Sequence, residues 1–163
     1  MDGLLKEERK RAGDVNKKAI VDAARKGSMP VAYCGFSCNH CFLGEWCGGC
    51  RSVFCCCSFG TLFEKGKCPN ITCCQEKGLE GCFFCNELEG CTKGFYAENN
   101  DGAAACKAQA LFIKKHGAEK FLKVQDKLHE KYDFRKIQEI LGNHPDEALC
   151  LLEETWEVLQ KTN

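Results

Sequence analysis

Cysteine is the residue that most constrains how this chain can fold. The 163-residue sequence contains 16 cysteines, and all of them except Cys106 and Cys150 lie within residues 34–101. A short chain this rich in cysteine is either a disulfide scaffold or a metal-binding protein. The first cluster, in "YCGFSCNHC", has the spacing C-x3-C-x2-C. Zinc sites, iron–sulfur clusters and fragments of a disulfide framework can all have that spacing.

The N-terminal segment favours metal over disulfides. Residues 1–27 are dense in charge and contain no apolar run long enough for the core of a signal peptide. A membrane-spanning helix needs about 18 consecutive apolar residues, and the sequence contains no such stretch. We therefore expect a cytoplasmic protein that does not span a membrane. In that reducing compartment disulfides are rare, and cysteine clusters usually bind metal or react.

Composition divides the chain into three parts. Residues 1–33 contain no cysteine, and their apolar residues recur at helical spacing, which predicts an N-terminal amphipathic helix and a linker. Residues 34–101 are the expected cysteine-rich metal-binding module, and residues 102–163 are expected to be helical. The predicted fold class is small α plus irregular structure. A metal-stabilised knuckle module would be flanked by the N-terminal helix and by a C-terminal bundle of three to four helices.

Capping residues and periodicity support the C-terminal helices. Asp101 can cap a helix that stops at Gly117, and Pro145 suits the first turn of the last helix. Between them, residues 118–132 place apolar residues on one broad face, and residues 133–141 follow with Asp133 as a possible cap. The last helix is predicted to carry an apolar stripe of Leu149, Leu152, Trp156 and Leu159. Cys106 and Cys150 fall inside the predicted helices, and we interpret both as small buried residues rather than ligands.

The middle part contains three C-x2-C pairs, Cys38/Cys41, Cys47/Cys50 and Cys82/Cys85. Such a pair puts two thiolates on one tight turn, where both can bind one ion at about 2.3 Å from each sulfur. Three pairs so close together strongly indicate metal but do not select which metal. This part has few long apolar periods, so it can hardly bury a core of its own. Thiolate–metal bonds would replace that core, at an apparent roughly 10–16 kcal/mol per structural zinc.

Some cysteines are expected to pack rather than bind. Neighbouring side chains point in different directions, so the run Cys55, Cys56 and Cys57 cannot all face one ion, and the same holds for Cys73 and Cys74. His40, between two cysteines of the first motif, is expected to point away from the metal.

The segments "YCGFSCNHC", "CGGC" and "CPNITCCQEKGLEGCFFCNELEGC" resemble a known family. It is the cysteine-rich bacterial and archaeal domain family of unknown function numbered thirty-seven ninety-five. The resemblance covers about residues 33–96 and implies no established reaction. In this chain the gap before Cys91 is one residue longer than in the usual family pattern. The metal ligands that the resemblance implies are Cys34, Cys38, Cys41, Cys47, Cys50, Cys68, Cys73, Cys82, Cys85 and Cys91.

The identity of the metal stays open between zinc and iron–sulfur. Roughly ten to twelve thiolates could make two or three four-thiolate zinc sites, which we expect, or two [4Fe–4S] clusters with ligands to spare. The close ferredoxin run of cysteines is absent. The C-x3-C-x2-C motif also resembles that of radical S-adenosylmethionine enzymes. Their βα-barrel fold commonly needs roughly 200 residues or more, and this chain is shorter.

A binding or assembly role is expected rather than catalysis. The sequence contains no Ser–His–Asp order, phosphate-binding glycine loop or HExxH helix. Its 23 basic and 23 acidic residues balance, and each four-thiolate zinc would add a charge of about −2, which disfavours nucleic acid as a partner. The partner stays unknown and could be a protein. The alternatives are an iron–sulfur electron-transfer or redox protein and a thiol sensor with a reactive spare cysteine, such as Cys56 or Cys74.

Overall fold

The computed structural model describes residues 22–23, 25–41, 44, 47–55, 57–58, 67–97, 101–141 and 144–162. These residues form a mostly helical structure without a β-strand, as predicted, apart from an isolated bridge between Val31 and Ser37. The described helices are α3 (Pro69–Glu76), the 3-10 helices η3 (Cys82–Phe84) and η4 (Gly94–Ala97), α4 (Asp101–His116), α5 (Ala118–Lys131), α6 (Phe134–Leu141) and α7 (Pro145–Thr162). Helices therefore occur in each of the four C-terminal segments in which the sequence predicts them.

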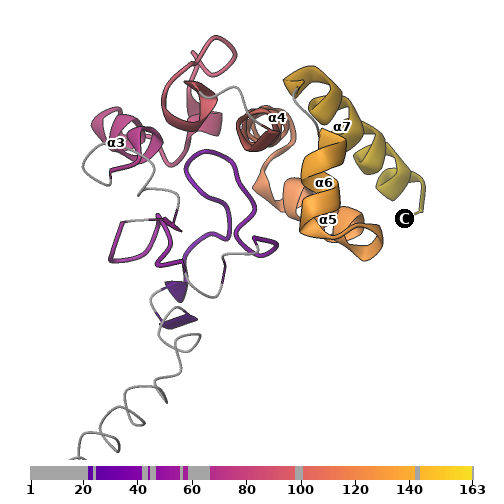
Figure 1. The fold of residues 1–163 in the computed structure, drawn as a ribbon, viewed down its shortest axis with the longest axis horizontal. Helices are drawn as coiled ribbons and strands as arrows, with labels where there is room; N and C mark the ends of the chain where they lie inside the picture. Colours follow the sequence, from indigo (N-terminus) through magenta and orange to yellow (C-terminus); the bar gives the residue numbers. More distant parts are fainter. Residues whose placement is uncertain are drawn as a thin grey trace, which may run out of the picture.

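Helix α4 lies between the cysteine-rich part and the C-terminal helices (Figure 1). It contacts α5, α6 and α7, and it also contacts η3 and η4. Five of its alanines are buried on several sides of the helix, and their small side chains let both neighbouring layers approach closely. These residues are Ala103, Ala104, Ala105, Ala108 and Ala110.

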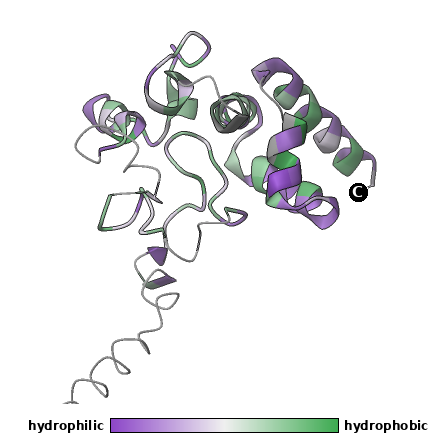
Figure 2. Cartoon of the chain, in the orientation of Figure 1, coloured by the Kyte–Doolittle hydropathy of each residue, from purple (hydrophilic) through white to green (hydrophobic). Residues whose placement is uncertain are grey.

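Helices α5, α6 and α7 each contribute apolar residues to the buried core. Hydrophobic and hydrophilic residues alternate along these helices (Figure 2). Phe112 on α4 and Phe121 on α5 are fully buried, with ring centroids 6.4 Å apart. On α7 the predicted stripe is present, since Leu152 is fully buried and Trp156 packs partly buried against the core. Burial of several large side chains at about 1.5–3 kcal/mol each explains why these helices are stable together.

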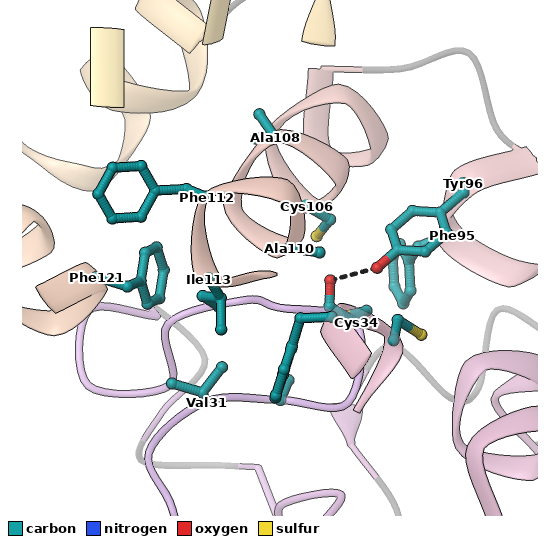
Figure 3. Close-up of a cluster of buried hydrophobic side chains, with 14 of the residues drawn as sticks. Val31, Cys34, Phe95, Tyr96, Cys106, Ala108, Ala110, Phe112, Ile113 and Phe121 are labelled. Carbon is teal, nitrogen blue, oxygen red and sulfur yellow. Dashed lines mark hydrogen bonds between the residues drawn. The ribbon is translucent and has the colours of Figure 1, made fainter. Parts of the chain in front are cut away.

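The cysteine-rich part shares this core instead of forming one of its own (Figure 3). Val31, Phe83, Leu88 and Phe95 belong to the same buried cluster as the residues of α4. The buried hydroxyl of Tyr96 donates a hydrogen bond to the carbonyl oxygen of Cys34 at 2.7 Å, which ties η4 to the first cysteine loop. The expectation that this part cannot bury an independent core agrees with that arrangement.

The sequence predictions for the N-terminal helix, for the two helical cysteines and for membrane spans have different outcomes. Most of the predicted N-terminal helix, residues 1–21 and 24, lies outside the described residues, so that helix stays a prediction. The prediction that Cys150 is buried is wrong, because Cys150 is exposed on α7. Cys106 on α4 is buried, as predicted. In the part of the chain that the structure describes, none of the helices has the length and apolar character needed to cross a membrane.

The contact between the first cysteine loop and α4 predicts the effect of a substitution at Gly35. This residue has φ +93°, and a Cβ added to it would lie 2.8 Å from the Cα of Ala110. Gly117 has a similar φ of +89° but open space around it. We expect Gly117→Ala to lower the free energy of unfolding by about 1–2 kcal/mol through backbone strain alone. Gly35→Ala should lower it by about 1–3 kcal/mol more, since overpacking adds to the strain.

Urea-induced unfolding of both variants, followed by circular dichroism, measures that difference. Equal losses of stability in Gly35→Ala and Gly117→Ala would contradict the close contact between the loop and α4.

Candidate thiol site

A cavity of about 390 Å³ opens beside α3 and η3, and five cysteines line it. We call it the outer thiol cavity. Its wall also includes a buried amide side chain and two lysines. The cysteines are Cys73, Cys74, Cys82, Cys85 and Cys91, the amide is that of Asn70, and the lysines are Lys77 and Lys93.

Helix α3 supplies two of these thiols in different settings. The helix starts after Cys68, with Pro69 at its first position, where the missing N–H of proline costs no hydrogen bond. Cys74 is 2% exposed and belongs to the core, whereas its neighbour Cys73 is only partly buried. Cys74 therefore packs in the core, and Cys73 is the more accessible of the two thiols.

The C-x2-C pair of the cavity is held by η3. The N–H of Cys85 donates to the carbonyl oxygen of Cys82 at 2.9 Å, which closes the turn between the two thiols. The N–H of Cys82 itself donates to the carbonyl oxygen of Tyr33 at 2.8 Å. The turn is therefore anchored to the first cysteine loop as well as to its own backbone. Cys91 follows on the next turn, where its N–H donates to Leu88.

Asn70 organises the floor of the cavity. Its side chain is 1% exposed, and its Nδ2 donates to the sulfur of Cys82 at 3.6 Å. Its Oδ1 accepts the N–H of Phe95 at 2.9 Å and the thiol of Cys68 at 3.7 Å. A Cβ at Gly94 would lie 2.1 Å from that oxygen, so only glycine fits there. A single buried amide thus links α3, η3 and η4.

Cys74 and Cys82 form a close thiol pair, with their sulfurs 3.6 Å apart. Their shared hydrogen bond lowers the pKa of Cys82 to about 6, and the amide of Asn70 contributes in the same direction. The same hydrogen bond raises the pKa of Cys74, and burial adds to this. Cys82 is therefore the thiolate of the pair at neutral pH, and Cys74 is the hydrogen-bond donor.

Two lysines face sulfurs of the outer thiol cavity. The ammonium group of Lys77 lies 3.8 Å from the sulfur of Cys85, and that of Lys93 lies 3.8 Å from the sulfur of Cys73. Lys77 also pairs with Glu87. Each of these two sulfurs therefore has an ammonium group as a hydrogen-bond donor.

A second group of thiols surrounds Cys34 of the first cysteine loop, which contacts Cys106 of α4. We call it the inner thiol group, and it comprises Cys34, Cys38, Cys50, Cys57, Cys68 and Cys106. A hydrogen bond with Cys106 raises the pKa of Cys34, and burial adds to this. A hydrogen bond with Cys57 lowers the pKa of Cys68. Burial raises the pKa of both Cys38 and Cys50 to about 12.

Cys106 and Asn70 are the residues that sequence reasoning missed. Cys106 stands alone within a helical segment, far in sequence from the cysteine pairs, so its spacing gives no signal of the contact with Cys34. Asn70 follows Cys68 and Pro69, where its position would suggest only a helix start. Tertiary packing places both residues beside thiols.

The predicted ligands are thus distributed over two places. Cys73, Cys82, Cys85 and Cys91 line the outer thiol cavity, and Cys34, Cys38, Cys50 and Cys68 belong to the inner thiol group. The structure does not bring all ten predicted ligands together. Within the described ranges, no three His, Cys, Asp or Glu side chains surround a single-ion position.

Two further predicted ligands, Cys41 and Cys47, lie near the inner thiol group. Cys41 is an electrostatic neighbour of Cys38. Burial tends to raise the pKa of Cys47, but hydrogen bonds from Ser58 outweigh it and lower that pKa. The backbone N–H of Ser58 lies 3.2 Å from the sulfur.

Among the other thiols, Cys55 is exposed, and its sulfur accepts a hydrogen bond from the side chain of Gln75 at 3.0 Å. The backbone of Cys55 is in the left-handed region, with φ 46°. Cys56 lies outside the described residues.

His40 contacts Ser37 and two residues of α5. Its Nδ1 is 3.1 Å from the hydroxyl of Ser37, its Nε2 is 3.1 Å from Asp126, and its ring stacks on that of His129 at 4.1 Å. Ser37 is 2% exposed, and the adjacent cavity has a volume of about 10 Å³. That His40 points away from a metal stays a prediction.

The close thiol pair predicts how stability depends on pH in the reduced protein without added metal. Since the pKa of Cys82 falls from 9.0 to about 6 on folding, the unfolded chain binds more protons between these values. The free energy of unfolding should therefore rise from pH 6 to pH 9. Above pH 9 it should fall, because the raised pKa of Cys74 reverses the sign.

Urea titrations at several pH values between 6 and 10 test this dependence. Cys74→Ala removes the donor to Cys82 and should flatten the rise. A Cys74→Ala variant with the same pH dependence as the wild type would contradict the role of the pair.

Comparison with models of protein families, with curated protein sequences and with solved structures finds no match to this chain. The resemblance to the cysteine-rich domain family therefore stays a prediction.

Proposed function

We propose that this chain is a cytoplasmic metal-binding protein whose thiolates hold metal in the outer thiol cavity and in the inner thiol group. The metal replaces a larger hydrophobic core in the cysteine-rich part and keeps it in shape for a binding or assembly role. The observation that carries the proposal is the 390 Å³ cavity, into which α3, η3 and the following turn direct five cysteines.

Hydrogen-bond donors lie beside three sulfurs of the outer thiol cavity. Asn70 donates to Cys82, Lys77 to Cys85 and Lys93 to Cys73. Thiolate sulfur is both the metal ligand and the better hydrogen-bond acceptor, so donors at three of the sulfurs prepare them for a cation. Thiols that only filled space would need no such donors.

Zinc is the metal that we propose for the inner thiol group and the adjoining knuckles Cys38/Cys41 and Cys47/Cys50. Zinc with four thiolates is a common structural site and carries a net charge of about −2. Arg25 is a neighbour of both Cys38 and Cys47, and Arg51 is a neighbour of Cys50, so cations are in place to offset that charge. Two or three metal sites in the whole chain fit the number of available thiols.

The partner is proposed to be a protein rather than a nucleic acid. The chain carries no net charge, with 23 basic and 23 acidic residues, and each thiolate-bound metal site adds negative charge. Nucleic-acid binding depends on positive groups that displace counterions from phosphates, and this protein has no excess of them.

Paired cysteine variants test the proposal. We expect Cys82→Ser to lose the metal of the outer thiol cavity and to unfold the surrounding segment, since binding worth about 10–16 kcal/mol supports it. Cys150→Ser is the matched control, because Cys150 is exposed on α7 and distant in sequence from both thiol groups. Anaerobic purification followed by elemental analysis gives the metal content per chain. Near-ultraviolet circular dichroism reports the packing of the aromatic residues.

The two variants must differ for the proposal to stand. If Cys82→Ser and Cys150→Ser bind the same amount of metal as the wild type, the outer thiol cavity is not a metal site. Sulfurs of the native protein paired with one another as disulfides would also exclude it.

A further inference from the structure

We propose that the outer thiol cavity binds a [4Fe–4S] cluster, with Cys73, Cys82, Cys85 and Cys91 as its four ligands. This inference rests on the proposed function and specifies the cofactor of that same site. It concerns the outer thiol cavity alone and leaves zinc as the metal proposed for the inner thiol group.

The size of the cavity favours a polynuclear cofactor. A single zinc ion lies within about 2.3 Å of each of its sulfurs and fills the space between them. The outer thiol cavity has a volume of about 390 Å³. The cysteines that line it come from three segments, which are α3, η3 with the residue after it, and the turn that carries Cys91. A cubane of four iron and four sulfide atoms would occupy such a space, with each of the four cysteines bound to a different iron.

The one close pair of sulfurs does not make a single-ion site. Two thiolates on one tetrahedral zinc are about 3.8 Å apart, as the zinc–sulfur bond length requires. Cys74 and Cys82 have a comparable separation of 3.6 Å. In the described part of the chain, however, no third cysteine, histidine or carboxylate completes a single-ion group around them.

The close pair also decides which cysteine of α3 is the ligand. Two sulfurs 3.6 Å apart are too close to bind two different irons of one cubane, so Cys74 and Cys82 cannot both be ligands. Cys74 is 2% exposed inside the core, whereas Cys73 is partly exposed and faces Lys93. Cys73 is therefore the ligand, and Cys74 is a thiol that donates a hydrogen bond to Cys82.

Three of the proposed ligands already have the outer contacts that a cluster needs. Cys73 faces Lys93, Cys82 accepts from Asn70, and Cys85 faces Lys77. A [4Fe–4S] cluster with four thiolates is an anion, so two ammonium groups beside it lower the cost of holding that charge. Hydrogen bonds to the ligand sulfurs and nearby charge also set the reduction potential of such a cluster.

Anaerobic reconstitution tests the inference. The full chain, reduced and freed of metal, is incubated with ferrous iron and sulfide and then separated from the excess. We expect about four iron and about four acid-labile sulfide atoms per chain, with a brown colour and a broad visible absorption band. After reduction by dithionite, the cluster should give an electron paramagnetic resonance signal of a reduced [4Fe–4S] centre.

Cysteine variants assign the cluster to this cavity. Cys73→Ala should lose most of the iron and sulfide, and Cys150→Ala, at an exposed cysteine on α7 outside both thiol groups, should keep both. Cys85→Ser, at a partly exposed residue, should behave like Cys73→Ala and guards against a loss of folding at α3. Retention of the full cluster in Cys73→Ala and Cys85→Ser would place it elsewhere and overturn the inference.

A lysine variant reports on the environment of the cluster. Lys93→Met removes a positive charge near Cys73, so the more negative reduced form loses stabilisation and the reduction potential should decrease. Lys123→Met, at an exposed lysine on α5, should leave the potential unchanged. Equal potentials in the wild type and in Lys93→Met would overturn the placement of the cluster beside Lys93.

The result for zinc separates this inference from the proposed function. A colourless protein that takes up zinc and loses it in Cys73→Ala and Cys85→Ser overturns the iron–sulfur cluster but supports metal binding by the cavity. A cavity that binds neither zinc nor the cluster overturns both.

Discussion

The close approach of the cysteine-rich part to the alanine-lined helix α4 is the constraint on which the structure depends. Gly35 lies against the backbone of Ala110, and Tyr96 bonds the carbonyl oxygen of Cys34 across the same contact. A larger side chain on either side would separate the two layers. Because the turns around the cysteines have little core of their own, α4 provides the surface on which they are ordered.

Electrostatics differ between the two thiol groups on this scaffold. In the inner thiol group, burial raises the pKa of Cys38 and Cys50 to about 12, so deprotonation there needs a bound cation. In the outer thiol cavity, hydrogen bonds from Cys74 and Asn70 lower the pKa of Cys82 to about 6. Thiols of the same residue type therefore differ in pKa because of the burial and the hydrogen-bond partners of each one.

Local patterns predicted much of the fold and less of the site. Helices α4 to α7 follow from capping residues and apolar periodicity, which depend on residues near one another in sequence. The C-x2-C pair Cys82/Cys85 was recognisable for the same reason. Sequence could not predict that Cys106 would meet Cys34, or that Lys93 would face Cys73, because these contacts depend on how helices pack. The exposure of Cys150 was mispredicted because its burial was inferred from the residue type, although it is the face of α7 with Leu152 that packs against the core.

The amide of Asn70 has a consequence for communication within the molecule. One side chain accepts from Cys68 of the inner thiol group and donates to Cys82 of the outer thiol cavity, and it is 1% exposed. Loss of the proton of Cys68 on one side of this amide removes a donor and changes how the amide is held on the other. By thermodynamic reciprocity, an event at Cys82 acts on Cys68 with the same coupling free energy. The two places are thus linked through the hydrogen bonds of one buried carboxamide.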